Sequence, residues 1–424
     1  MTGSPDATDP RPSPGLVPVL LGGDIGVYAL ARCFHEAYGV RATAIAPSPT
    51  QVLTRSRVVR TVALGEGAGP RDYVDAALEV ARATPGAHRV LLANTDWHIR
   101  VINDHRDELA EHFAIPVVDA DVAARVSDKA VFSEVCEELG IPTPRTVVQD
   151  FSGADDAAWR PADVSALGEP FIAKPASSSE YNELAMEGKK KVWVVPGSEA
   201  ATQLWDRLRE AGFRGQFLAQ ELVPGDDTAM RSLTAYVDST GTVALTGSAR
   251  VLLEDHAPTM LGNPVSMITE DLPDMMEQAV RFLEHVGYRG FANFDVKVDP
   301  RDGRAVFFEV NPRIGRNCYY MAAAGRNPVR AAVRDLVQGR HVVPERVEEE
   351  VLYSLLPHRL LLRYLRDPEQ RSRVTRLVRE GRAANPLRYR ADRSLRRTLV
   401  VALQELNQYR KFARYYPEAT DSSF

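Results

Sequence analysis

The sequence predicts a mixed α/β fold with some α+β elements. Near the N-terminus, an apolar run at residues 17–21, a glycine-rich turn at 22–26, an amphipathic segment ending at Tyr38 and a second apolar run at 41–46 follow one another. This order is typical of the first unit of a doubly wound sheet. Later in the chain, residues 290–316 predict a β-hairpin, because two alternating apolar runs flank a turn-forming segment.

Length and composition indicate a globular protein of two or three domains. The 424 residues are 44% hydrophobic and 26% charged, and the formal net charge of −5 argues against general nucleic-acid binding. The cysteines Cys33, Cys136 and Cys318 show no metal-binding pattern, so we expect a reducing cytoplasm rather than a disulfide framework. We expect no export, since the chain lacks a signal pattern and a segment able to span a bilayer.

The N-terminal region begins with a tail, residues 1–15, whose four prolines predict disorder. The turn at 22–26 lacks the full dinucleotide-binding spacing, and no acid ends the following strand, so a plain strand-to-helix turn is favoured over a nicotinamide site. Another strand, 89–93, leads into Asp96 at a sheet edge where ligands often bind. Asp96 is expected to cap a helix, with substrate contact as the alternative.

A lysine opens the next predicted helix. The helix spans 127–139, with Ser127 or Asp128 as its cap and Gly140 near its end. Lys129 stands in the first turn, where the helix dipole disfavours a cation. A neighbouring phosphate would explain this position, and an ordinary surface lysine is the alternative.

A second lysine ends the strand predicted at 170–175. Lys174 would be costly to bury without an anionic partner, which favours a functional role. The residues on either side, 150–168 and 176–191, are predicted loops, and the second contains Ser177 and Ser178.

The chain then continues with a helix at 199–212 and an apolar strand at 216–223. Arg231 opens the following strand and is a candidate clamp for a substrate carboxylate. Residues 250–255 and 262–263 are expected to form a turn region before a helix at 271–286.

The hairpin carries the residues best suited to a metal. Side chains two apart in a strand share a face, which places Glu309, Asn311 and Arg313 together and Asp295 across from them. Two carboxylates and an amide oxygen suit Mg²⁺. On spacing alone, a solvated ribbon with cross-strand salt bridges is equally plausible.

These motifs, in this order, resemble the ATP-grasp ligases, which make an acyl phosphate from a carboxylate and ATP and let an amine attack it. The resemblance implies a Rossmann-like pre-ATP-grasp domain at 16–122, an ATP-grasp domain at 123–340 with a hinge near 221–224, and a basic helical extension at 341–424.

The same resemblance implies the roles of individual site residues. The metal ligands are Asp295, Glu309 and Asn311. The residues on ATP are Lys129 and Lys174 for phosphates, Glu221, Leu222 and Val223 for adenine, Asp227 or Asp226 for ribose, and Ser177 and Ser178 in the place of the phosphate-covering loop.

Within that group the chain resembles the D-aspartate ligase branch of peptidoglycan cross-bridge synthesis. The matching motifs are 20–24, 27–28, 31–32, 174–176, 180–181, 187–188, 224–227, 230–231, 252–255, 290–295 and 315–316. The resemblance implies ATP and Mg²⁺, or Mn²⁺, as cofactors, D-aspartate as the activated acid, and a nucleotide- or lipid-linked stem peptide as the amine. It places Lys174, Arg313 and Arg316 in catalysis, with Arg231, Arg313 and Arg316 on the substrate. Residues 317–320 depart from the family pattern, which leaves the shape of the acid pocket open.

Two other functions fit the same motifs: a peptide ligase of secondary metabolism, and an ATP-binding scaffold that has lost catalysis. No general base for the amine is evident from the sequence.

The C-terminal extension is strongly basic. From residue 351 onward it has 16 Lys and Arg against seven Asp and Glu, and repeating leucines and arginines at 355–379 predict amphipathic helices. Such faces are usually solvated or packed on the enzyme. The alternative is docking of an anionic precursor or of the inner membrane surface.

Overall fold

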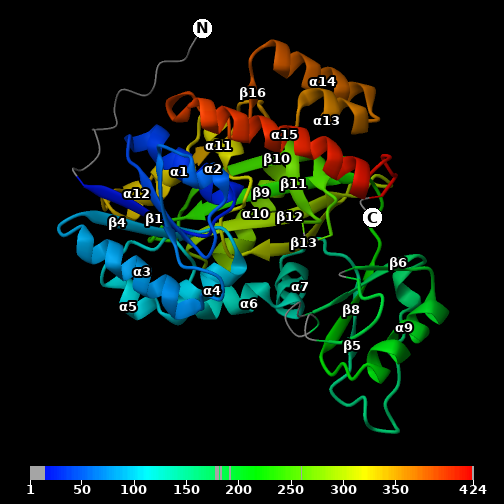
Figure 1. Cartoon of the computed structure of the whole chain (residues 1–424). Helices are drawn as coiled ribbons and strands as arrows, with labels where there is room; N and C mark the ends of the chain where they lie inside the picture. The colour runs from blue at the N-terminus through cyan, green and yellow to red at the C-terminus, as the bar shows by residue number, and fades with distance from the viewer. Residues whose placement is uncertain (1–14, 177–180, 182–183, 191, 259, 423–424) are drawn as a thin grey trace. The chain divides into compact units, whose positions relative to one another are not determined.

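The computed structural model describes residues 15–176, 181, 184–190, 192–258 and 260–422 (Figure 1). The chain forms two compact units. Unit 1 takes its described residues from Met1–Phe132, Asp227–Val296 and Glu309–Ala419, and unit 2 takes them from Ser133–Asp226, Lys297–Phe308 and Thr420–Phe424. The N-terminal region, part of the middle region and most of the basic extension therefore share one unit.

Unit 1 begins with a parallel four-stranded sheet, which confirms the predicted α/β start. Its strand order is β3-β2-β1-β4, from β1 (Leu16–Leu21), β2 (Ala42–Ala46), β3 (Val59–Ala63) and β4 (His88–Ala93). The accompanying helices are α1 (Ile25–Tyr38), α2 (Gln51–Thr54), α3 (Pro70–Ala83), α4 (Asp96–Asp104), α5 (Arg106–Ala110) and α6 (Ala120–Ser127). The turn before α1 is held by Asp24, whose Oδ1 accepts from Val27 N at 3.0 Å.

A second, eight-stranded sheet holds the predicted hairpin. The order β13-β12-β9-β10-β11-β15-β16, with β14 beside β10, uses β9 (Met230–Val237), β10 (Val243–Asp255), β11 (Asn263–Thr269), β12 (Gly290–Val298), β13 (Ala305–Asn311), β14 (Glu345–Arg346), β15 (Leu352–Ser354) and β16 (Ala383–Ala384). Helices α10 (Pro273–His285), α11 (Tyr319–Ala323) and α12 (Pro328–Leu336) belong to the same part of the chain. Residues 250–255, expected in a turn, are instead the end of the 13-residue strand β10.

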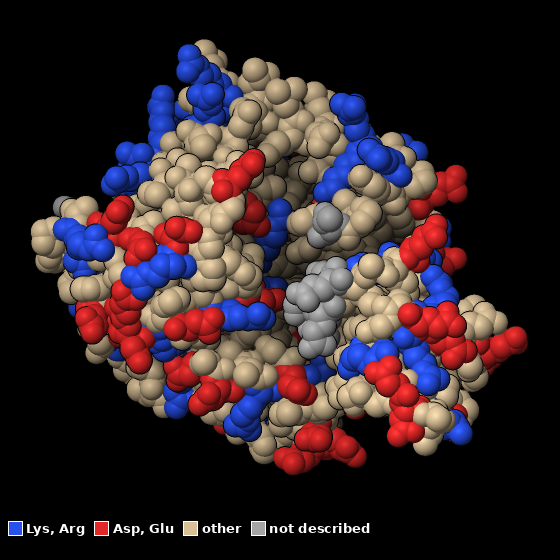
Figure 2. Space-filling view, turned by 60° about the horizontal axis from the view of Figure 1, so that its bottom comes forward, with Lys and Arg blue, Asp and Glu red and all other residues tan. Residues whose placement is uncertain are grey.

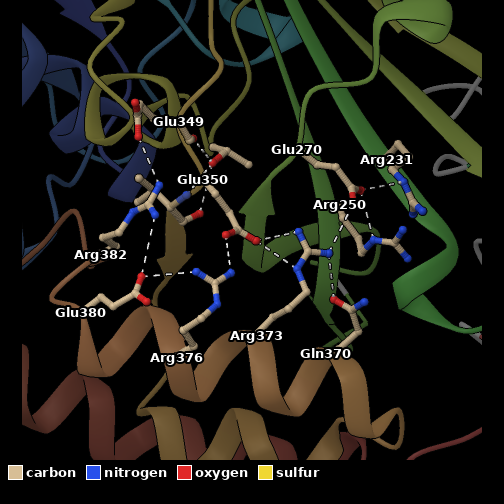
Figure 3. A network of polar contacts seen from close by, with 12 residues as sticks. Arg231, Arg250, Glu270, Glu349, Glu350, Gln370, Arg373, Arg376, Glu380 and Arg382 are labelled. Carbon is tan, nitrogen blue, oxygen red and sulfur yellow. Dashed lines mark hydrogen bonds and ion pairs between the residues drawn. The ribbon is translucent and has the colours of Figure 1, made fainter.

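The basic extension is built into unit 1. Besides β15 and β16 it contains α13 (His358–Tyr364), α14 (Pro368–Arg379) and α15 (Leu395–Tyr415). Figure 3 shows how α14 is tied to residues next to β11 and β15: Arg373 forms ion pairs with Glu270 at 3.3 Å and with Glu350 at 2.8 Å. Further ion pairs join Arg376 with Glu350 and Glu380, and Arg382 with Glu349 and Glu380.

Helix α1 also holds the extension. Arg32 is 9% exposed, and its Nη1 donates to the backbone oxygens of Asn385 and Pro386 at 3.1 and 2.8 Å. Tyr28 Oη donates to Asp392 at 2.8 Å, and the guanidinium of Arg397 lies 4.2 Å from the Tyr28 ring centre. The extension therefore shares polar contacts and core with the N-terminal region.

Unit 2 contains an antiparallel sheet in the order β5-β8-β6-β7, formed by β5 (Thr146–Asp150), β8 (Gln216–Glu221), β6 (Phe171–Pro175) and β7 (Trp193–Val195). Helix α9 (Ser198–Glu210) packs on it through Leu204, Trp205 and Leu208. Helix α7 (Lys129–Glu138) ends near Gly140, as predicted, and begins in unit 1.

Two general expectations can be compared with the described residues. Cys33, Cys136 and Cys318 are buried and form no disulfide with one another. Among the residues the structure describes, no helix is long and apolar enough to cross a membrane. Figure 2 shows Lys and Arg interspersed with Asp and Glu over the face in view.

Candidate active site

The hairpin brings the three predicted metal ligands together. Asp295 lies on β12, and Glu309 and Asn311 lie on β13, all of them partly buried. Asn311 Nδ2 donates to Asp295 Oδ2 at 3.0 Å and to Asn293 O at 3.3 Å. The alternation of side chains along each strand thus places both carboxylates on one face of the ribbon, as the sequence predicted.

The electrostatics of this face fit a cation. Removal from water, and then the neighbouring Glu309 carboxylate, raise the pKa of Asp295 to about 7. A divalent cation would stabilise two ionised carboxylates that repel each other in a partly buried position, and the amide of Asn311 adds a third oxygen donor. In the described residues no group of three or more His, Cys, Asp and Glu could hold a metal, so a cation bound here would need the amide oxygen of Asn311 as its third donor.

Two arginines follow the hairpin and point to the N-terminal part of unit 1. Arg313 Nη2 donates to Asn311 Oδ1 at 3.0 Å, and its Nε lies 3.3 Å from Asp96 Oδ1. Arg316 Nε donates to Asp24 Oδ2 at 2.7 Å. Arg313 thus lies beside Asn311 and Asp96, and Arg316 lies beside Asp24, all within unit 1.

The turn after β1 lies against Arg316. A Cβ added at Gly26 would come within 2.1 Å of Asn94 Nδ2 and 2.8 Å of Arg316 Cγ, so only glycine fits. Asn94 Nδ2 donates to Asp24 Oδ1 at 3.2 Å. The turn between β1 and α1 therefore packs against the side chains of Asn94 and Arg316.

Polar atoms without hydrogen-bond partners lie beside this turn. Asn94 is 3% exposed, and its buried Oδ1 has no hydrogen-bond partner in the described structure; the same holds for His98 Nε2. Burial lowers the pKa of His98 to about 4, partly countered by Asp24. Helix α4 is capped by Thr95, which accepts from His98 N, and not by Asp96, which was the expected cap.

The predicted phosphate-binding lysines stand where the sequence placed them. Lys129 is the first residue of α7, preceded by Asp128, whose Oδ1 accepts from Ala130 N at 2.8 Å and Val131 N at 3.1 Å. Lys174 lies on β6 of unit 2 and is partly buried. Ser177 and Ser178 lie outside the described residues.

The predicted adenine segment, 221–223, begins at the last residue of β8. The carboxylate of Glu221 is 6% exposed and accepts from Arg145 Nε at 3.1 Å and Arg301 Nη2 at 3.2 Å. Burial opposes ionisation of Glu221, but its bonds to Arg145 and Arg301 prevail and lower its pKa. The Glu221 side chain thus pairs with two arginines of unit 2, while Leu222 and Val223 follow the end of the strand.

The predicted ribose acid is turned inward. Asp227 is 2% exposed, and its Oδ2 accepts from Glu254 N and contacts His256 Nε2, each at 2.9 Å. His256 stacks on Tyr416 with ring centres 3.6 Å apart. This arrangement gives Asp227 a place in the core of unit 1, and Asp226 is the more accessible of the two acids.

The predicted substrate clamp Arg231 points away from the metal-type face. Ser232 and Thr234 donate to Asn293 Oδ1 at 3.2 and 2.9 Å, so the alternating Arg231 projects from the other side of β9. There Arg231 is 4% exposed and its Nε lies 3.6 Å from Glu270 (Figure 3). Burial and the charge of Arg250 lower its pKa to about 10, countered in part by Glu270. The structure does not bring Arg231 together with Arg313 and Arg316.

The segment that departs from the family pattern is mostly structural. Tyr319 Oη donates to Glu36 at 3.0 Å, Tyr320 Oη donates to Gly247 O at 2.9 Å, and Cys318 is fully buried. Asn317 Nδ2 lies 3.0 Å from Met267 Sδ. Cys318, Tyr319 and Tyr320 belong to the core of unit 1, and Asn317 is buried beside it.

Comparison with known proteins agrees with this arrangement. The model for the ATP-binding domain of the carbamoyl-phosphate synthase L chain matches residues 241–326. The biotin carboxylase domain of Hydrogenobacter thermophilus 2-oxoglutarate carboxylase, in complex with MgADP and bicarbonate, shares the fold with a TM-score of 0.57 and 15% identity, over 79% of this chain and 73% of that one. The N5-carboxyaminoimidazole ribonucleotide synthetase of Thermus thermophilus gives a TM-score of 0.54 and 18% identity, over 79% of this chain and 82% of the other.

The matching family model, the shared fold and a full-length relative together identify the chain as an ATP-grasp ligase of the ADP-forming class. A D-aspartate ligase of Enterococcus faecium (strain Aus0004) is 31% identical over 412 residues, which are 94% of this chain and 96% of the relative. The chain belongs to the D-aspartate ligase family.

Several residues of the site were not singled out from the sequence. Asn94 and His98 carry buried polar atoms beside the turn at 22–26, and Asp24 pairs with Arg316. Asn94 follows β4 directly, at the carboxyl edge of a parallel sheet, and that position was the available signal.

Proposed function

We propose that this chain joins D-aspartate to an amine acceptor, using ATP and Mg²⁺ to activate the side-chain carboxylate. The observation that carries the proposal is the hairpin face, where burial and the neighbouring Glu309 carboxylate raise the pKa of Asp295, with Asn311 beside it. Membership of the D-aspartate ligase family supports D-aspartate as the acid. The acceptor that we propose is the side-chain amine of a diamino acid in a peptidoglycan precursor.

The proposed chemistry has two steps. A carboxylate oxygen of D-aspartate attacks the γ-phosphorus of ATP, the bond to the β-phosphate oxygen breaks, and ADP leaves. The amine nitrogen then attacks the acyl carbon, phosphate leaves with its oxygen, and the nitrogen loses a proton as the amide forms. Phosphate is a far better leaving group than oxide, which is why the ATP is consumed.

Residues of this chain would bind and position the reactants. Asp295, Glu309 and Asn311 would hold Mg²⁺, which neutralises charge on the phosphates when bound. Lys129 and Lys174 would bind phosphate oxygens.

The arginines would contact the acid. Arg313 and Arg316 now pair with Asp96 and Asp24, and we propose that a substrate carboxylate or the acyl phosphate competes for these guanidinium groups. For the nucleotide, residues 221–223 would contact the adenine and Asp226 the ribose.

The test is substrate-dependent nucleotide turnover. ADP and phosphate should appear only when D-aspartate and an amine-bearing stem peptide are both present, and Glu309→Gln should lower the rate at least about a hundredfold because a metal ligand is lost. Asp302→Asn is the matched control, since Asp302 is an exposed carboxylate at the turn of the same hairpin. Turnover unchanged in Glu309→Gln, or turnover with a different amino acid and none with D-aspartate, would refute the proposal.

A further inference from the structure

Helix α15 has a solvent-facing row of leucines. Leu395, Leu399, Leu403 and Leu406 are 93%, 61%, 55% and 62% exposed. Their spacing of three or four residues places them along one face of the helix. The helix is fixed to unit 1 by its other side, where Arg397, Val401 and Phe412 are buried. The leucine row therefore serves no packing purpose within the described structure.

The same exposed side carries positive charge. Arg396, Arg410 and Arg414 are exposed and, by helical spacing, lie beside the leucine row. The one acid of this helix is Glu405, whose carboxylate is bonded to Arg388 at 2.6 and 2.7 Å. The outward face of α15 is therefore apolar and cationic, with its acid already paired.

These two properties select among possible partners. A second copy of the helix could cover the leucines, but it would bring more arginines against those of the first copy, without acids to pair them. Residues 1–14 contain no Leu, Ile, Val, Phe or Trp to cover the row. An anionic lipid surface satisfies both properties, because it offers acyl chains to leucines and phosphates to arginines.

We propose that α15 binds the surface of an anionic membrane, lying in the plane of the headgroups. Leu399, Leu403 and Leu406 enter the boundary of the acyl chains, while the arginine heads reach lipid phosphates. Tyr409 is 40% exposed at the side of the leucine row, a position suited to a ring at headgroup level. The helix does not cross the bilayer, in keeping with the absence of a spanning helix from the described residues.

The experiment is co-sedimentation of the full chain with vesicles. We expect binding to vesicles of phosphatidylcholine mixed with phosphatidylglycerol, and little to vesicles of phosphatidylcholine alone. Leu399→Gln/Leu406→Gln and, separately, Arg396→Gln/Arg410→Gln/Arg414→Gln should each weaken the partition about tenfold or more. Val343→Gln is the control, since Val343 is 70% exposed and lies outside α15. All substituted residues are exposed, and far-UV circular dichroism checks that each variant folds.

Three results would overturn the proposal: equal binding to neutral vesicles, binding unchanged in both sets of variants, or no vesicle binding by the native chain. Sedimentation velocity identifies the rival occupant. A concentration-dependent dimer that Leu399→Gln/Leu406→Gln dissociates, without vesicle binding, would assign the leucine row to a second copy of the chain. Because no substrate is needed, the outcome is independent of the proposed ligase reaction.

Discussion

Replacing Asp392 by alanine should destabilise unit 1 strongly. The Asp392 side chain is fully buried and accepts from Tyr28 Oη at 2.8 Å, Ser56 Oγ at 2.7 Å and Arg57 N at 2.5 Å. It also forms an ion pair with Arg397 Nε at 3.0 Å. Without the carboxylate, a guanidinium that is only 3% exposed would remain buried without its counter-ion. Removing one partner of a buried pair costs about 3–5 kcal/mol, and the stranded hydroxyl donors add to the loss.

The measurement is urea denaturation followed by far-UV circular dichroism. Asp392→Ala should lower the free energy of unfolding by about 3–5 kcal/mol. Glu418→Ala, an exposed acid of the same extension, should leave it within about 0.5 kcal/mol. Arg397→Met in the Asp392→Ala background should recover part of the loss, because it removes the stranded charge. A loss below about 1 kcal/mol in Asp392→Ala would refute the inference that this contact holds the extension to the N-terminal region.

Two further predictions concern the turn at 22–26 and its neighbours. Gly26→Ala should abolish the ligase activity or unfold unit 1, because the added Cβ would come within 2.1 Å of Asn94 Nδ2. Gly153→Ala is the control: a Cβ at Gly153 would meet open space, so this variant should retain both the activity and the melting temperature. An active and stable Gly26→Ala protein would contradict the packing described for this turn. Burial lowers the pKa of His98 from 6.5 to about 4, so the unfolded chain takes up a proton more readily and stability should fall as the pH falls from 6.5 to 4. His98→Gln should flatten that part of the stability profile measured by urea denaturation, and an unchanged slope would show that His98 does not contribute to it.

Local patterns predicted the parts of the fold that depend on near neighbours. The start of the sheet and the hairpin were found because their side-chain periods and turn residues lie within short segments. The proximity of Asp295, Glu309 and Asn311 was predicted for the same reason, since all three belong to one ribbon. The acid-rich end of β10 was predicted as a turn because its partners are distant: Glu254 N donates to Asp227, and Asp255 pairs with Lys411.

Local patterns also did not predict which face of a sheet a given side chain would point to. Alternation shows that Arg231 and Ser232 point to opposite faces, but it does not tell which face carries the site. The face on which each side chain lies is seen from its partner in the structure. Ser232 donates a hydrogen bond to Asn293, whereas Arg231 forms an ion pair with Glu270. Similarly, Asp24 and Arg316 are 292 residues apart in the sequence. The residues next to each of them in the chain give no indication that the two side chains form a hydrogen bond.

Helix α1 shows why distant parts of the chain depend on one another. At its start, Asp24 holds the Arg316 guanidinium beside the candidate site. In its middle, Tyr28 and Arg32 hold the extension through Asp392 and backbone oxygens 353 to 364 residues away. Near its end, Glu36 accepts from Tyr319, which belongs to the segment after Arg316. Because one rigid helix makes all these contacts, the basic extension, the turn at 22–26 and the loop after the hairpin form a single packed body, and the extension is as much a part of the enzyme's core as its first strand.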